Sequence, residues 1–544
     1  MSSSVELTGK KRWWALVVLA LGVAMIILDG TVVNVALPAM VKDLDLSTTD
    51  AEWVTAAYAL TFASLLILNG RLADRFGRRL LFALGIVLFV GASVLVAIST
   101  NSIEVIGARA LQGVGGAMIL PASLSVINAV FTGRSRAIAF AVWGSTIGGM
   151  AALGPLVGGY LTTYQSWHWA FLINVPIGIL VLIGLFMFVP ETKDETGRKG
   201  IDIPGTILVT LGLIGVVFAL IEGQHYGWVI STTEFRAGAL TWPADTISIV
   251  LVAGIIGIAA LVALVFVEKA RLRAGKIVII DLRLFRIRSF GAGNIVALVV
   301  SLGEFGLLFT IPLFLQAVRG YSAMETGVIL VALAAGAFVA SGAGAGMSQR
   351  LGPVRVLQIG MGLEVIGIIG IGVVMSTTVT GWGLAPWLFI YGAGVGFATA
   401  QLTGVILSEI PVSESGSASA VQSTSRQVGA AIGTAILGTT LLIGLGSYTS
   451  SQLTDRGVPA TAATQVADAM QASAGQAVPA LASQPNGQVL VEGASEGFVD
   501  ATKTVAWVAA LFVFLGLLTS FLLPRNAARV ESEGYEPPKQ EEKS

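Results

Sequence analysis

An aspartate and an arginine stand inside long apolar stretches of the sequence. Asp29 lies in the stretch 13–38 and Arg109 in the stretch 103–128. If both stretches are helices, the two residues lie roughly 14 Å and 9 Å from the same side of a membrane, at 1.5 Å per residue. Burial favours the neutral form of a carboxyl group, and a nearby guanidinium favours the charged form. The pair therefore predicts a proton switch, with a static ion pair joining two helices as the alternative.

Two glutamates stand near the middle of two later apolar stretches, Glu304 in 290–316 and Glu364 in 354–375. Because lipid does not tolerate a charged carboxylate, both must face the interior of a helix bundle. Each could bind a proton, attract a cationic substrate, or hydrogen-bond to a neighbouring helix, and these three interpretations stay open. With Asp29 and Arg109, they are the predicted proton-coupling residues.

The elements that position these residues are apolar stretches of about 20 residues, the length that crosses a bilayer. Of the 544 residues, 55% are hydrophobic and only 12% are charged. We therefore predict an all-α polytopic membrane protein with about 14 transmembrane helices. The predicted spans are 13–38, 51–72, 80–99, 103–128, 137–161, 168–189, 203–222, 246–268, 290–316, 325–347, 354–375, 386–408, 425–445 and 504–523.

Most of the 32 lysines and arginines fall in alternate connections, on the side that holds both termini. Cytoplasmic loops carry such an excess, so we predict a multi-pass plasma-membrane protein with both termini in the cytoplasm.

Several classes of function are disfavoured by composition. The formal net charge is zero, which argues against nucleic acid as a partner. The chain has no cysteine and only two histidines, so we predict neither a metal site nor a cofactor. It also lacks the glycine-rich phosphate-binding loop of ATP-driven machines, and we predict that it is not an enzyme.

An internal sequence repeat suggests that the two halves of the chain arose by duplication. The segment 70–79 between the second and third spans resembles the segment 345–352 between the tenth and eleventh, about 275 residues later. Such spacing predicts two pseudo-symmetric six-helix halves plus a two-helix insert, with chance similarity as the alternative. The predicted divisions are a cytoplasmic N-terminal segment (1–12), an N-terminal half (13–189), the insert (190–268), a linker (269–289), a C-terminal half (290–523) and a cytoplasmic tail (524–544).

Two connections each allow two interpretations. The linker 269–289 is basic with an apolar stripe, which indicates either an amphipathic helix on the inner membrane surface or a plain basic linker. The outer loop at about 446–500 is rich in Ala, Ser, Gln and Thr. It could form short helices over the outer mouth or a flexible tether.

Four motifs together resemble the major facilitator superfamily, in particular its fourteen-span branch of drug:proton antiporters. They are the segment 28–38 in the first span, 70–79 in the loop after the second, 109–115 in the fourth and 154–159 in the fifth. The resemblance implies multidrug-resistance-type efflux by alternating access of two halves, and it covers most of the chain.

The candidate gating residues of the loop motif are an acid, two of its arginines and two glycines. Asp74, Arg75 and Arg78 stand in a tight turn bounded by Gly70 and Gly77, which permit backbone geometries that other residues resist. An aspartate near a helix end can pair with arginines and with a helix dipole, so we predict a latch for one arrangement of the halves. The resemblance implies the same gating role. A topology marker supplied by positive charge alone is the alternative.

The fifth-span motif holds Gly154, Pro155, Gly158 and Gly159. These residues would let the helix bend and let another backbone approach closely, and the resemblance associates the motif with antiport.

Aromatic side chains near the expected cavity could hold flat or cationic ligands, although packing in the core or against lipid is the alternative for each. The candidates for substrate binding are Tyr58, Phe62, Trp143, Phe305 and Phe309.

Taken together, the sequence predicts a secondary active exporter that exchanges amphiphilic drugs or toxic small molecules for protons. The expected partners are such a substrate, protons and the lipid bilayer, and the expected state is a monomer. A same-fold exporter of one metabolite, siderophore or lipid is one alternative. A membrane scaffold or sensor without transport is another, which the buried acids disfavour.

Overall fold

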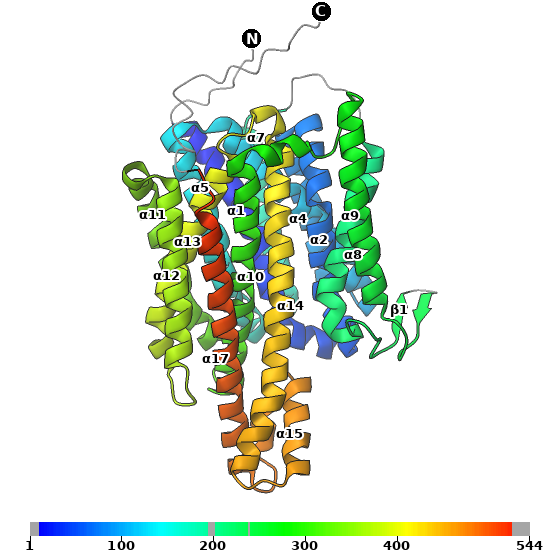
Figure 1. The fold of residues 1–544 in the computed structure, drawn as a ribbon, viewed down its shortest axis with the longest axis vertical. Coiled ribbons are helices and arrows are strands. Elements are labelled where there is room, and N and C mark those ends of the chain that lie inside the picture. The colour runs from blue at the N-terminus through cyan, green and yellow to red at the C-terminus, as the bar shows by residue number, and fades with distance from the viewer. Residues whose placement is uncertain (1–9, 194–201, 238–239, 525–544) are drawn as a thin grey trace, which may run out of the picture.

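The computed structural model describes residues 10–193, 202–237 and 240–524, and almost all of them are helical (Figure 1). The N-terminal half contains α1 (Lys10–Asp43), α2 (Thr48–Phe76), α3 (Arg78–Ile98), α4 (Ser102–Val130), α5 (Gly133–Tyr164), α6 (Trp167–Leu172) and α7 (Asn174–Phe188). The insert contains α8 (Ile203–Tyr226), β1 (Phe235–Ala237), β2 (Leu240–Trp242) and α9 (Ile249–Arg273). The C-terminal half contains η1 (Leu282–Arg286), α10 (Arg288–Ala317), α11 (Ala323–Leu351), α12 (Pro353–Val374), α13 (Gly381–Leu407), η2 (Val412–Glu414), α14 (Ser415–Asp455), α15 (Ala460–Ala472), α16 (Val478–Leu481) and α17 (Gly487–Ser520).

Within the described residues, twelve helices are long and apolar enough to cross a membrane, and the bent α5 makes thirteen. The 30-residue α10 occupies the remaining predicted position. The prediction of an all-α polytopic protein is thus confirmed, and a count of fourteen spans is compatible with it. The start of α1 and the end of α17 lie at the same end of the bundle, here called the terminal face (Figure 1). The other end is called the distal face.

Capping residues display the internal repeat. A capping box at Ser47 begins α2 and one at Ser322 begins α11, and each hydroxyl accepts a bond from the third residue of its helix. Gly77 ends α2 with φ of 119°, and Gly352 ends α11 with φ of 84°, both in the range that favours glycine. Each pair is 275 residues apart. The second helix of each half therefore has the same start and stop signals.

The two halves meet along several helix pairs, which include α5 with α13 and α4 with α14. In the N-terminal half α2 and α3 pack on α4 and α1 packs on α5, and in the C-terminal half α11 and α12 pack on α13 and α10 packs on α14. Across the seam α5 packs against α11 and α2 packs against α14. A Cβ atom on Gly327 of α11 would meet the Leu156 backbone of α5 at 2.7 Å, so the helix backbones approach closely there.

The insert is a helix pair on the outside of this seam. Helices α8 and α9 pack closely: a Cβ atom on Gly257 would meet the Val216 nitrogen at 2.7 Å. Helix α8 also packs on α2 and on α14, so it touches both halves. The antiparallel pair of β1 and β2 projects at the distal face (Figure 1).

Three sequence-based boundaries differ from the structure. The segment 269–289 is not one amphipathic helix, because α9 ends at Arg273, a loop follows, and only the 3-10 turn Leu282–Arg286 precedes α10. Its apolar residues Ile279 and Ile280 pack into the core instead of lying on a membrane surface. The outer loop at 446–500 is largely helical, formed by the ends of α14 and α17 with α15 and α16 beyond the bundle (Figure 1). The thirteenth span begins as α14 at Ser415, ten residues before the expected start.

Candidate functional site

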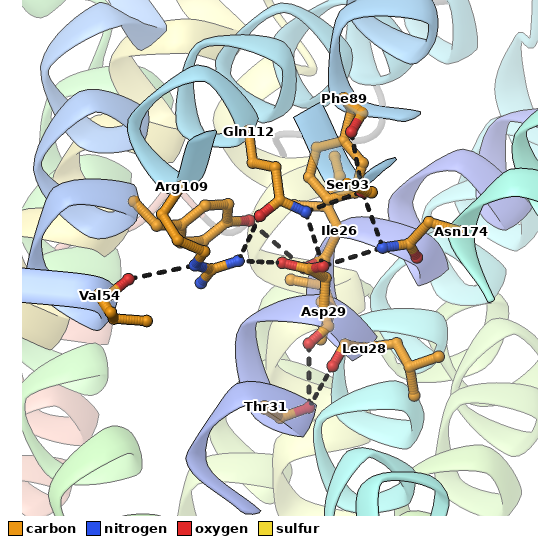
Figure 2. A network of polar contacts seen from close by, with 12 residues as sticks. Ile26, Leu28, Asp29, Thr31, Val54, Phe89, Ser93, Arg109, Gln112 and Asn174 are labelled. Atoms are coloured by element: carbon orange, nitrogen blue, oxygen red, sulfur yellow. Dashed lines mark hydrogen bonds and ion pairs between the residues drawn. The ribbon is translucent and has the colours of Figure 1, made fainter. Parts of the chain in front are cut away.

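Asp29 lies at the centre of a buried polar network in the N-terminal half (Figure 2). Its Oδ2 accepts from Arg109 Nη1 at 2.5 Å, and its Oδ1 accepts from Gln112 Nε2 and Asn174 Nδ2, each at 2.9 Å. Ser93 Oγ accepts from both amides at 2.8 and 3.1 Å. All five side chains are buried. We call them the N-terminal network.

Arg109 is held on its other sides as well. Its Nε donates to the Val54 carbonyl at 3.1 Å, its Nη1 also donates to Gln112 Oε1 at 2.8 Å, and its guanidinium lies 4.4 Å from the ring centre of Tyr58. The network thereby joins α1, α2, α3, α4 and α7. Three donors, one of them a guanidinium, thus converge on the carboxyl group of Asp29 and tie these helices together.

The predicted pairing of Asp29 with Arg109 is present, whereas the supporting side chains were not predicted. Gln112 belongs to the motif 109–115, but its neutral amide, like that of Asn174, carries no charge signal in a hydropathy profile. Ser93 is one serine among many in apolar helices. Only the fold brings these residues to the aspartate.

Asp74 connects the two halves at the terminal face. Its carboxylate pairs with Arg78 at 2.8 Å and accepts from the backbone nitrogens of Gly416 and Ser417 at 2.8 and 2.9 Å. Those nitrogens lie at the start of α14, where unpaired amides and the helix dipole favour an anion. Both Asp74 and Arg78 are buried. The acid therefore fastens α2 to α14 at the terminal face.

The other predicted gating residues have distinct positions. Gly70 lies against α14, where a Cβ atom would meet the Gly416 oxygen at 2.5 Å. Gly77 faces Glu191, whose carboxylate accepts from the backbone nitrogens of Arg79 and Leu80 at the start of α3. Arg75 is exposed, with its guanidinium 5.0 Å from the centre of the Phe76 ring. The latch therefore consists of Asp74, Arg78 and the close approach at Gly70.

Glu304 and Glu364 lie in a second buried cluster, in the C-terminal half. Glu304 Oε2 pairs with Arg426 Nη2 at 3.2 Å, and the Tyr391 hydroxyl donates to the Glu304 carbonyl at 3.0 Å. Glu364 lies within electrostatic range of both Glu304 and Arg426 but has no hydrogen-bond partner for either oxygen. Arg426 was not predicted as a site residue. It was placed at the end of a span, whereas α14 carries it more than ten residues inside the helix.

The fifth-span motif lies beside the N-terminal network. Cβ atoms on Gly154 and Gly158 would collide with Thr31 and Val32 of α1, two and three residues after Asp29. The segments Ile138–Ala151 and Leu153–Tyr164 meet at 41°, one turn before Pro155, where a proline removes a helical hydrogen bond. Gly159 is buried. The motif thus sets how closely α5 approaches α1.

Substitution of Gly154 by alanine is expected to lower the free energy of unfolding by about 1–3 kcal/mol, because the new methyl group overpacks the contact with Thr31. Thermal unfolding in detergent measures this effect. Gly107→Ala is the matched control: it lies in α4, and a methyl group added there would meet open space, so it should be neutral or slightly stabilising. Equal melting of the two variants would contradict the close α1–α5 packing.

The aromatic candidates are mostly core residues. Tyr58 and Phe62 are buried and stack on each other at 5.8 Å, and Tyr58 also lies beside Arg109. Trp143 is buried and donates to Ser123 Oγ at 3.0 Å. The side chains of Phe305 and Phe309 lie outside the described residues. Of these candidates, Tyr58 is the one in contact with the N-terminal network.

Comparison with known proteins identifies one matching family model and several similar proteins. Residues 19–434 match the family model of the Major Facilitator Superfamily. The "Probable actinorhodin transporter" of Streptomyces coelicolor is 34% identical, with 82% of this chain and 75% of that protein covered. The "Puromycin resistance protein pur8" of Streptomyces alboniger is 34% identical, with coverage of 79% and 82%. The "Multidrug efflux pump LfrA" of Mycolicibacterium smegmatis is 30% identical, with coverage of 94% and 96%.

Solved structures agree in fold. The human organic anion transporter MFSD10 has a TM-score of 0.56 at 15% identity, with 95% of this chain and 100% of that chain covered. The proton:xylose symporter XylE has a TM-score of 0.56 at 14% identity, with coverage of 96% and 98%. At such identities the likeness concerns the fold alone. The resemblance inferred from the motifs is confirmed, and this chain, a transporter and not an enzyme, belongs to the Major Facilitator Superfamily.

Proposed function

We propose that the chain is a proton-coupled exporter of amphiphilic small molecules. The observation that carries the proposal is the buried pair of Asp29 and Arg109, since a charged pair of this kind is costly in a membrane unless it serves a function. The names of the relatives, which refer to drug efflux, antibiotic resistance and antibiotic transport, support the substrate class.

The proposed cycle uses the two contacts described above. The latch at Asp74 keeps the terminal face closed, and Asp29 takes a proton when the distal face opens to water. Neutral Asp29 no longer holds Arg109, so α1, α4 and α5 are free to shift and the halves rock to open the terminal face. Release of the proton there restores the pair. In this scheme the terminal face is cytoplasmic, as the distribution of lysine and arginine favours.

The energy of one proton is sufficient for export. A proton crossing 100 mV provides about 2.3 kcal/mol, and one pH unit adds about 1.4 kcal/mol. Together these support a substrate concentration ratio of several hundred.

The same proposal places the chain in the plasma membrane as a monomer. It also keeps the sequence-based division into two halves and an insert.

Cells with and without the chain test this function through retention of ethidium, a fluorescent amphiphilic cation. Cells that contain the chain should retain less ethidium, and a protonophore should abolish the difference. Equal retention under all four conditions would contradict export.

A narrower substrate range is the second candidate, because two of the relatives are named for single compounds, actinorhodin and puromycin. A panel of chemically distinct compounds separates the two. Transport of one chemical class alone would favour a dedicated exporter, and transport of several would favour a multidrug exporter.

A further inference from the structure

Glu304 occupies the position in the C-terminal half that Asp29 occupies in the N-terminal half. Each lies in the first long helix of its half, α1 or α10, and the two are separated by the same 275 residues that relate the caps of α2 and α11. Each is buried and pairs with an arginine from another helix of its own half, Arg109 or Arg426. The two acids are therefore related by the repeat, whereas their arginines come from the fourth helix of one half, α4, and the fifth helix of the other, α14.

The two pairs differ in their surroundings. The N-terminal pair is completed by neutral side chains, since Gln112 and Asn174 donate to Asp29 and Ser93 of α3 holds both amides. In the C-terminal half the corresponding third helix, α12, contributes a carboxyl group, Glu364, in place of a hydroxyl. Two carboxyl groups thus share one guanidinium.

The charge balance of this cluster requires a proton. Glu364 is fully buried, and neither of its oxygens nor Glu304 Oε1 has a hydrogen-bond partner. Two buried carboxylates beside one guanidinium would leave a net negative charge without compensation, which costs several kcal/mol. One bound proton gives a neutral cluster, with Glu304 ionised beside Arg426 and Glu364 neutral.

No other described group supplies a compensating charge. From α13, the Tyr391 hydroxyl is directed to the Glu304 carbonyl, and Thr399 Oγ1 lies 3.4 Å from Arg426 Nη1. Helix α17 packs on α10, α12 and α14, but its Ala509, which lies against Gly303 of α10, is at least six residues after Asp500 and Lys503. The relevant titratable and charged groups are therefore Glu304, Glu364, Tyr391 and Arg426.

We propose that Glu304, Glu364 and Arg426 form a second exchangeable proton site, so that each transport cycle, which proceeds only through protonation of Asp29, moves one proton more than Asp29 alone would carry. The inference rests on the proposed function and assigns part of its proton stoichiometry. Arg426 is the positioning residue: it keeps Glu304 ionised and leaves the proton on Glu364. When water reaches the cluster in another conformation, the O–H bond of Glu364 breaks and the proton passes to water.

Helix α14 can connect this site to the latch. Its first residues bind Asp74 across the seam, and Arg426 lies ten residues after Gly416, about 15 Å along the same helix. Release of the latch would therefore move Arg426 relative to Glu304 of α10. Proton exchange at the cluster and opening of the terminal face are thereby coupled through one rigid element.

The test is the number of protons exchanged per tetraphenylphosphonium ion in proteoliposomes that contain the full chain. The opposing substrate gradient that stops net flux at a fixed proton gradient gives this number. Glu364→Gln should exchange one proton fewer than the unsubstituted protein. Glu268→Gln, a buried glutamate in α9 of the insert, is the matched control and should keep the original number.

An unchanged proton number in Glu364→Gln would overturn the second site while leaving the proposed function intact. If the unsubstituted protein shows no proton-coupled flux, the proposed function fails and the stoichiometry with it. Should Glu364→Gln not fold, Glu304→Gln decides the question, since it leaves one carboxyl group for one guanidinium and should also lose one proton. The infrared absorption of neutral carboxyl groups should be weaker in Glu364→Gln than in the resting unsubstituted protein, by the intensity of one group, which provides a readout independent of transport. An unchanged absorption would contradict the assignment of the proton to Glu364.

Discussion

Replacement of Asp29 by asparagine should abolish gradient-driven export while the protein still reaches the membrane. The substitution removes the proton-binding oxygen and leaves Arg109 without its buried counter-ion, although Val54, Gln112 and Tyr58 still contact it. Loss of one partner of a buried pair costs about 3–5 kcal/mol, so a lower melting temperature is also expected. The substrate ratio maintained against a proton gradient, several hundred for each proton exchanged, should fall to about one.

Asp43→Asn is the matched control for this prediction. Asp43 ends the same helix, and its carboxylate accepts from Trp167 Nε1 at 2.8 Å, a bond that an asparagine oxygen can keep. Cells with this variant should export as well as cells with the unsubstituted chain. Gradient-driven accumulation that survives Asp29→Asn would show that Asp29 and Arg109 form only a structural ion pair.

Replacement of Asp74 by asparagine should open the terminal face. The carboxylate makes charge-assisted bonds to the backbone of Gly416 and Ser417 across the seam, and their loss is expected to cost the closed arrangement about 2–3 kcal/mol. The ratio of closed to open molecules should then fall roughly 30- to 150-fold. The chain has no cysteine, so cysteines introduced at exposed Leu80 of α3 and exposed Leu351 of α11 can be spin-labelled selectively. The distance between the two labels reports the opening of this face.

Arg75→Ala is the control, because Arg75 neighbours Asp74 but is exposed, with its guanidinium over the Phe76 ring. Its label distances should match those of the unsubstituted chain. If Asp74→Asn also leaves the distribution unchanged, the contact between α2 and α14 does not determine the closed state.

Much of the fold follows from patterns that the sequence displays directly. Apolar stretches long enough to span a membrane predict the helices. The repeated segment around Asp74 predicts the duplication, which the matching caps at Ser47 and Ser322 also show. The start of α14 was missed because hydropathy averages over all faces of a helix. Its first turns are rich in Ser and Gln, which look like a loop, yet Ser417, Ser419 and Gln422 are buried within the bundle.

The candidate sites were predictable only where charge marks them. Asp29 and Arg109 stand out in apolar surroundings, and their pairing follows from similar depth. Arg426 was hidden because the same error at the start of α14 placed it at the membrane surface instead of beside Glu304. Which of two glutamates pairs with an arginine depends on the rotation of three helices, and that rotation has no signal in a single sequence.

The most direct test of the central claim is proton movement driven by substrate in proteoliposomes loaded with a pH-sensitive dye. A gradient of tetraphenylphosphonium, without any imposed proton gradient, should drive protons in the opposite direction through the unsubstituted protein and through Asp43→Asn. Asp29→Asn should still bind tetraphenylphosphonium but move no protons. Proton movement by Asp29→Asn at the rate of the unsubstituted protein would contradict the account, because coupling would then not depend on the buried aspartate.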